Sequence, residues 1–294
     1  MYYRRKIILA LLQVFGGELG KINLQKLLFL ICKKQKEPDY DFIPYLYGCF
    51  SHSARADLST MVKKGFLEEN DNSYTKKDKK NYLLLLDEAD QKVVNQTYLL
   101  YNKLDREGLM KYTYTHYPYY AINSTLADKL LNKEQLSKID AVRPVTTDTI
   151  LFTIGYEGSS LEAYLNKLVH HDIKTLVDVR NNPLSQKFGF SKSQLQRYCA
   201  GLNIEYIHFP DVGIQSEYRQ QLNTQGDYDK LFDTYKLKTL SQTLSTQEHI
   251  LTILKEKKRI ALTCFEANIC QCHRKHLAES ITGLSGWNYE LKHI

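Results

Sequence analysis

Residues 149–180 read TILFTIGYEGSSLEAYLNKLVHHDIKTLVDVR, and this stretch decides the fold of the C-terminal half. It begins with an apolar run that ends at Gly155. An amphipathic segment follows over residues 161–173, and a second apolar run occupies residues 174–180. Two apolar runs that flank an amphipathic helix are typical of parallel strands joined by a right-handed crossover.

The same alternation continues to residue 281. We expect a helix, a strand, a helical tract, a strand and the start of a last helix at 191–203, 204–213, 227–256, 258–266 and 272–281. The sequence therefore predicts an α/β fold with a Rossmann-like parallel sheet over residues 150–294.

The N-terminal part has helical periodicity instead. An amphipathic helix is expected over residues 4–15, and a second helix begins with Asn23 as its N-cap. An extended segment then turns at Gly48 and leads into a third helix that ends before Gly65. Residues 66–86 are expected to form a two-stranded wing with a polar tip, which gives a mainly helical domain in winged-helix order.

The domain boundary is expected in the polar stretch 132–150, which contains Pro144. This divides the chain into a DNA- or partner-binding module at residues 1–140 and the Rossmann-like domain at residues 150–294. With 294 residues, the chain is long enough for two cores.

The composition indicates a cytoplasmic protein. No apolar run approaches the roughly 18 residues of a membrane span, and no small-residue cleavage site follows the first apolar stretch. Six cysteines in a chain of this length do not predict a disulfide scaffold. The net charge of +7 is compatible with nucleic acid as a partner.

Polar side chains follow each predicted strand of the C-terminal half, where ligands of parallel sheets bind. They are Tyr156 and Glu157, Asp178 and Arg180, His208 and Asp211, and Cys264 and Glu266. Arg180, Arg219 and Arg274 surround the same edge and are predicted to hold a small anionic ligand. The alternative is that Arg180 pairs with Asp178 and braces the loops.

The stretch LTCFEANICQCHR, residues 262–274, allows three kinds of chemistry. A metal site is not expected, because Cys272 and His273 should diverge at a helix start and no second cysteine pair exists. As a thiol, Cys272 at a helix N-terminus is the better low-pKa candidate, whereas Cys264 is expected to pack. In the acid–base alternative, Asp178 and Glu266 act as acid and base, assisted by Cys272 and His273.

Motifs in this half resemble the family catalogued as domain of unknown function 488. They are TIGYEG, LVDVRNNPLS, IEYIHFPDVG and CFEANICQCHR. The resemblance implies the fold and a shared site, but no reaction. Its pattern falls on Gly155, Asp178, Arg180, Pro183, Ser185, His208, Gly213, Cys264, Glu266, Cys272, His273 and Arg274. We take Gly155, Tyr156, Ser185, His208 and Cys264 as pocket residues.

The N-terminal motifs INLQKLLFLI and YLYGCFSHSARADLSTMVKKGFLEE resemble Panacea-type, antitoxin-associated modules, with Cys49 where proline is usual. The resemblance implies a winged-helix-like module for contact with DNA or a protein partner. Arg55, Lys63 and Lys64 are its few basic groups on the third helix.

These observations predict a hydrolase-like enzyme directed at nucleic acid or a nucleotide, with a role in genome defence or modified-base processing. One alternative is a non-enzymatic DNA-binding regulator that senses a small anion. The other is a rhodanese-like thiol or sulfur-transfer enzyme, although Ile269 stands where such enzymes place an arginine. No cofactor is assigned, no membrane contact is expected, and a homodimer is left open.

Overall fold

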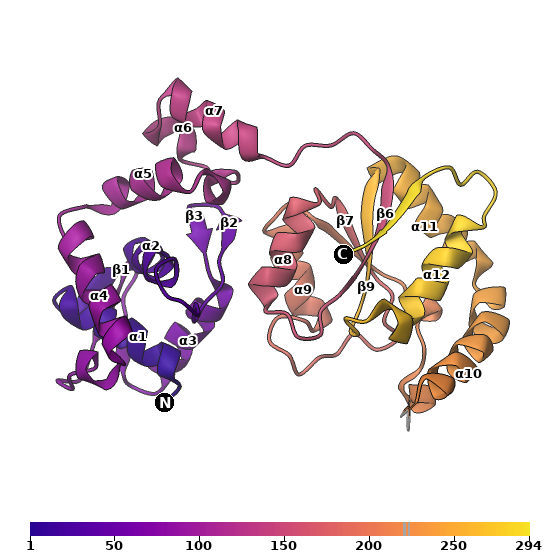
Figure 1. Ribbon diagram of the computed structural model, residues 1–294, viewed down its shortest axis with the longest axis horizontal. Coiled ribbons are helices and arrows are strands. Elements are labelled where there is room, and N and C mark those ends of the chain that lie inside the picture. The colour runs from indigo at the N-terminus through magenta and orange to yellow at the C-terminus, as the bar shows by residue number, and fades with distance from the viewer. Residues whose placement is uncertain (220–221, 223) are drawn as a thin grey trace. The chain divides into compact units, whose positions relative to one another are not determined.

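The structure is a computed structural model that describes residues 1–219, 222 and 224–294, without the side chains of residues 216 and 219. The chain divides into two compact units, Met1–Arg143 and Pro144–Ile294 (Figure 1). Each unit encloses its own cluster of buried apolar side chains.

The N-terminal unit is mainly helical. Its sheet is antiparallel with the strand order β1-β5-β4, and β2 and β3 form a separate hairpin. The elements are α1 (Tyr3–Val14), β1 (Glu18–Gly20), α2 (Lys21–Cys32), β2 (Ile43–Tyr45), β3 (Gly48–Phe50), α3 (His52–Lys63), β4 (Leu67–Glu69), β5 (Ser73–Lys76), α4 (Glu88–Tyr101), α5 (Arg106–His116), α6 (Ala127–Leu130) and α7 (Lys133–Val142), with single 3₁₀ turns at η1 (Leu83–Leu85) and η2 (Pro118–Ala121).

Helix α2 is the centre of this unit, and every residue from Leu24 to Cys32 is buried. The predicted N-cap at Asn23 is wrong, because α2 begins at Lys21 directly after β1. No loop separates the strand from the helix. The Lys21 N–H at the start of the helix donates to the Asn72 carbonyl at 2.8 Å. A backbone acceptor from the β4–β5 turn thus replaces a side-chain cap.

The predicted linker is also too long. Residues 133–142 form α7, whose start is fixed by a capping box between Asn132 and Gln135. Only the stretch from Arg143 to Thr149 lies outside regular structure before the next strand.

The C-terminal unit is a five-stranded parallel sheet with the order β10-β6-β9-β7-β8, which confirms the predicted parallel sheet. Helices α8 and α9 cover one face, and α11 and α12 cover the other (Figure 1). The elements are β6 (Ile150–Gly155), α8 (Leu161–His170), β7 (Thr175–Asp178), α9 (Lys192–Ala200), β8 (Glu205–His208), η3 (Pro210–Val212), η4 (Ser216–Arg219), α10 (Gln225–Tyr235), the π-helical turn η5 (Lys236–Leu240), α11 (Leu244–Lys257), β9 (Arg259–Cys264), η6 (Ile269–Gln271), α12 (His273–Thr282) and β10 (Glu290–His293).

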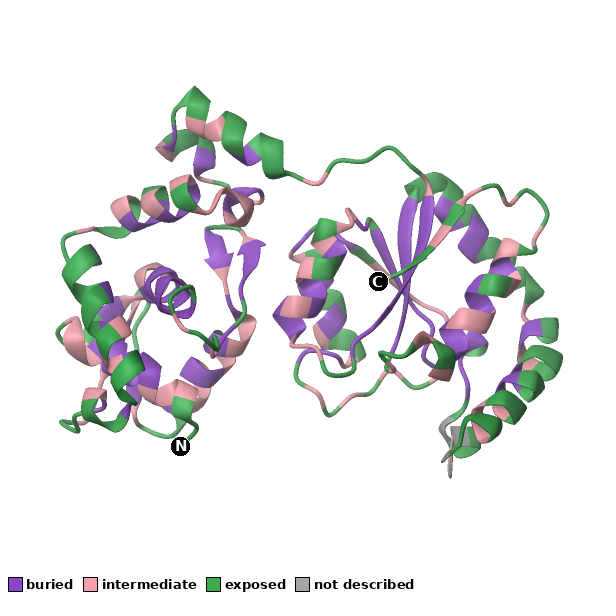
Figure 2. Ribbon diagram, viewed as in Figure 1, coloured by how far each residue is buried: buried purple, intermediate pink, exposed green. Residues whose placement is uncertain are grey.

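The apolar runs explain the centre of this sheet. Every residue of β6, β7 and β9 is buried (Figure 2), as parallel strands covered on both faces require. The edge strand β10 was not predicted, because its sequence ELKH is polar and mostly exposed.

Candidate functional site

The carboxyl ends of the central strands meet at one edge of the sheet. Gly155 pairs in register with Cys264, while Asp178 lies opposite Thr263 on one side and His208 on the other. The parallel register therefore brings together the strand-end residues that the sequence singled out.

The centre of this edge is an ion pair between Asp178, which is fully buried, and Arg180, which is 6% exposed. Nε of Arg180 donates to Oδ1 of Asp178 at 2.9 Å, and its Nη2 donates to Oδ2 at 2.5 Å. Tyr206 adds a donor from the neighbouring strand, since its hydroxyl lies 2.5 Å from Oδ2. Burial lowers the pKa of Arg180, but hydrogen bonds and charge attraction from Asp178 outweigh it, so the pKa stays above its ordinary value.

The remaining Nη1 of Arg180 is also occupied. It donates to the Tyr156 hydroxyl at 2.7 Å and to the Phe190 carbonyl at 2.9 Å. The Tyr156 and Phe190 rings stack with centroids 4.2 Å apart. Arg180 thus braces three segments of the unit, as in the loop-bracing alternative, and its role in anion binding stays a prediction.

Beside this ion pair lies a pocket of about 250 Å³, which we call the strand-end pocket. Four predicted residues line it, Tyr156, Arg180, Ser185 and Cys264, together with Asn181, Asn182, Leu184, Ile214 and Phe265. His208 lies next to it. Its Nε2 donates to the Arg180 carbonyl at 2.8 Å, which leaves Nδ1 to accept from the Lys192 ammonium at 3.2 Å.

Behind the pocket is the Cys264 cluster, formed by Cys264, Cys272 and His273. The two Sγ atoms and a ring nitrogen of His273 lie within 4.8 Å of one another. Cys264 Sγ is 3.7 Å from His273 Nδ1 and 3.1 Å from Oε2 of Glu266. The expected divergence of Cys272 and His273 is therefore wrong. Cys272 is the N-cap of α12, so its side chain precedes the helical turn and points back toward β9.

The low pKa predicted for the Cys272 thiol is not supported by its surroundings, and its catalytic role stays a prediction. Cys272 is fully buried, and burial raises the pKa of its thiol well above the ordinary value, with Cys264 and Glu266 acting in the same direction. The helix N-terminus does not compensate for the lost hydration. Cys264, which was expected only to pack, is the thiol that reaches the pocket.

Arg274 and Gly155 hold the loop that follows β9. Arg274 is 2% exposed and donates through Nη1 to the Glu266 carbonyl and through Nη2 to the Ala267 carbonyl, the latter at 3.1 Å. The Glu266 carbonyl packs so closely on Gly155 that a Cβ there would overlap it. Arg219 belongs to η4, but its side chain is outside the described part of the structure.

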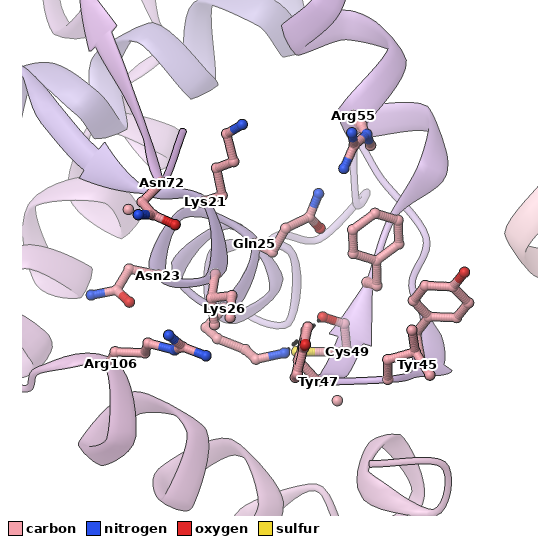
Figure 3. A pocket seen from close by; sticks show the side chains of 15 residues that line it. Lys21, Asn23, Gln25, Lys26, Tyr45, Tyr47, Cys49, Arg55, Asn72 and Arg106 are labelled. Atoms are coloured by element: carbon pink, nitrogen blue, oxygen red, sulfur yellow. Dashed lines mark hydrogen bonds between the residues drawn. The ribbon is translucent and has the colours of Figure 1, made fainter. Parts of the chain in front are cut away.

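The N-terminal unit contains a larger hollow of about 800 Å³, which we call the basic cavity (Figure 3). Lys21, Lys26, Arg55 and Arg106 line it, and no acidic side chain is among its described lining residues. The others are Gly20, Ile22, Asn23, Gln25, Tyr45, Leu46, Tyr47, Gly48, Cys49, Phe50 and Asn72.

Lys26 is the unusual residue of the basic cavity, because it is only 2% exposed. Its ammonium donates to the Cys49 carbonyl at 3.0 Å, beside Tyr47 (Figure 3). No carboxylate lies within ion-pair distance in the described part of the chain, and burial lowers the pKa of Lys26.

The sequence interpretation missed Tyr206 and Lys26. Tyr206 stands two residues before His208 on the same strand, and the alternation of side chains along a strand, which places both on one face, is the signal that could have found it. Lys26 stands within the apolar stretch of α2, but helical periodicity places it off the apolar face and gave no signal that it is buried.

In the described part of the chain, no helix combines the length and apolarity that a membrane span needs. No curated protein matches the sequence. Residues 160–281 match the model of a family described as Domain of unknown function DUF488, which supports the resemblance found in the strand-end motifs of the C-terminal unit.

Proposed function

We propose that the protein is a hydrolase-like enzyme directed at nucleic acid or a nucleotide. The observation that carries this proposal is the basic cavity, which gathers four cationic side chains and three aromatic rings. Cations suit phosphate oxygens, and aromatic rings stack on bases.

The buried ammonium of Lys26 is the strongest argument for an anionic ligand. An ammonium taken out of water without an opposite charge costs free energy unless a partner compensates it. The Cys49 carbonyl satisfies one of its three donors. A phosphate in the basic cavity would supply both the missing charge and further acceptors.

The guanidinium groups of Arg55 and Arg106 support the same ligand. Both side chains are exposed, and neither forms an ion pair with a described residue. They lie on opposite sides of the Gln25 and Lys26 side chains (Figure 3). A ligand that enters between them would meet positive charge from both sides.

The order of elements supports a winged-helix-like module for contact with DNA. Helix α1, strand β1 and helices α2 and α3 are followed by the β4–β5 hairpin, and β1 pairs with β5. At the wing, Lys76 pairs with Asp78 and Lys77 pairs with Glu68. Phosphate contacts from the wing are therefore expected mainly from Lys79 and Lys80.

Chemistry is proposed for the strand-end pocket. Asp178 is occupied by Arg180 and Tyr206, so the acid–base role falls on Glu266, whose carboxylate touches the thiol that lines the pocket. A second candidate is thiol catalysis by Cys264, favoured by its contact with His273.

Binding is tested by fluorescence anisotropy with labelled single-stranded DNA, duplex DNA and adenosine triphosphate over a salt series. Lys26→Met should weaken binding by about tenfold or more, while leaving the free energy of unfolding unchanged or raising it. Arg106→Gln should also weaken binding. Lys111→Gln, an equal charge change on an exposed residue of α5, is the matched control. If Lys26→Met binds all three probes as wild type does, the basic cavity is not the binding site.

Turnover is tested by mass spectrometry of the same probes after incubation. Glu266→Gln should abolish product formation and leave binding intact, whereas Glu279→Gln on α12 should keep both. Binding without turnover by the wild type would instead support the non-enzymatic regulator. Thiol catalysis is tested by alkylation in a Cys270→Ser background, which removes the exposed thiol.

A further inference from the structure

We propose that Cys264, Cys272 and His273 bind a Zn²⁺ ion at the floor of the strand-end pocket. Their ligand atoms lie within 4.8 Å of one another, and Cys264 Sγ is 3.7 Å from His273 Nδ1. In a tetrahedral zinc site, bonds of about 2.3 Å to sulfur and about 2.1 Å to nitrogen separate two such ligands by about 3.6 Å. Cys264 and His273 already have the spacing that a shared ion needs, and Cys272 Sγ lies within 4.8 Å of both ligand atoms.

The orientation of His273 favours a metal ligand. Its Nε2 lies 3.0 Å from the Val179 carbonyl, which can only accept a hydrogen bond, so Nε2 carries the proton. The lone pair of Nδ1 then faces Cys264. A metal-binding histidine commonly donates its other ring N–H to a backbone carbonyl in this way.

The charged groups around the Cys264 cluster also favour a bound zinc ion. Arg274 is buried, and no carboxylate of the described residues lies within ion-pair distance of its guanidinium. Two buried thiolates would give Arg274 the opposite charge that it lacks. Zn²⁺ and Arg274 together would balance the charges of two thiolates and the Glu266 carboxylate.

Three protein ligands leave the fourth zinc position for water, as catalytic zinc sites do. Because Cys264 lines the strand-end pocket, a zinc ion held by these residues could take its water from the pocket. Zinc lowers the pKa of bound water to about 7. The water would pass one proton to the Glu266 carboxylate, which is 3.1 Å from Cys264 Sγ, and remain on zinc as hydroxide. Metal binding goes beyond the proposed function, since it requires no particular substrate.

Zinc content tests the inference directly. The full chain is purified under reducing conditions, incubated with zinc, passed through a desalting column and analysed by mass spectrometry of the metal. We expect about one zinc per chain in the wild type and in Cys270→Ser, whose thiol lies outside the cluster. Cys264→Ser and Cys272→Ser should lose most of it.

Cobalt binding to the wild type tests the site even if the cysteine variants do not fold. The wild type loaded with Co²⁺ should show thiolate-to-cobalt absorption in the near ultraviolet and tetrahedral bands in the visible range. A folded wild type that retains neither zinc nor cobalt would refute the site, as would a folded Cys264→Ser variant with unchanged cobalt absorption. Both readouts are made without substrate, so a failure of the proposed nucleic-acid activity would not affect them.

Discussion

Asp178 is the most constrained acidic residue in the described part of the strand-end site. Its carboxylate is fully buried and receives hydrogen bonds from the Arg180 guanidinium, the Arg180 backbone N–H and the Tyr206 hydroxyl. Removing one partner of a buried ion pair of this kind is strongly destabilising, because the charge of the other partner stays buried without compensation.

We therefore expect Asp178→Asn to lower the free energy of unfolding by about 3–5 kcal/mol, measured by urea denaturation. The control is Asp172→Asn, which removes the partner of the half-exposed Lys174 and should cost less than about 1 kcal/mol. Equal effects of the two substitutions would mean that the Asp178–Arg180 pair contributes no more than a surface pair.

Part of this residue-scale picture could be predicted from the sequence. Parallel strands place their carboxyl ends together, which predicted that Asp178, His208 and Cys264 share one edge. The partners of each group could not be predicted, since they depend on side-chain directions after the strands end. For this reason the inward turn of Cys272, and the burial of Lys26 without a carboxylate partner among the described residues, became visible only in the structure.

At the scale of elements, the end of β6 fits against the loop that follows β9. The N–H groups of Tyr156 and Glu157 both donate to the Phe265 carbonyl, at 3.1 and 2.9 Å. This contact requires a residue without a side chain at position 155, because a Cβ would meet the Glu266 carbonyl and Ala267.

Gly155→Ala should destabilise the C-terminal unit by about 1–3 kcal/mol, because rigid backbone atoms must move to admit the methyl group. Thermal unfolding followed by circular dichroism measures the effect. Gly226→Ala in α10 is the matched control, since the nearest described atom to its Cβ would be Thr224 Oγ1 at 3.8 Å. If Gly155→Ala unfolds at the same temperature as the wild type, the loop after β9 can move to admit the methyl group at little cost in free energy.

Element type was predictable wherever hydrophobic periodicity was strong. The buried strands β6, β7 and β9 and the amphipathic helix α8 all lie within their predicted ranges. The prediction of a linker was wrong at α7, because a capping box starts a helix inside this polar stretch. Strand β10 was not predicted, because its sequence is polar. It is held to β6 by backbone pairing and by the contact of Thr153 Oγ1 with His293 Nδ1 at 2.8 Å.

At the scale of the whole molecule, three histidines couple stability to pH. Burial lowers the pKa values of His171, His276 and His293, and nearby cations such as Arg259 or Lys236 add to the effect. In the folded chain these rings stay neutral below the ordinary histidine pKa of about 6.5. The unfolded chain therefore binds more protons in that window, so stability falls as pH decreases.

We expect the urea midpoint to fall between about pH 7 and about pH 5, the range in which ordinary histidines titrate. Replacing His171, His276 and His293 by glutamine should flatten this dependence. A triple variant with the same slope as the wild type would show that these three histidines do not cause the effect.

The strand order β10-β6-β9-β7-β8 has a consequence for synthesis on the ribosome. The first strand of the sheet to be translated, β6, pairs only with strands near residues 259 and 290. A nascent chain that already carries the finished N-terminal unit must keep the apolar β6 without its neighbours until those residues emerge. Contacts this distant in sequence slow folding and expose unpaired strand edges. The C-terminal unit should therefore depend on chaperones during synthesis far more than the helical unit that precedes it.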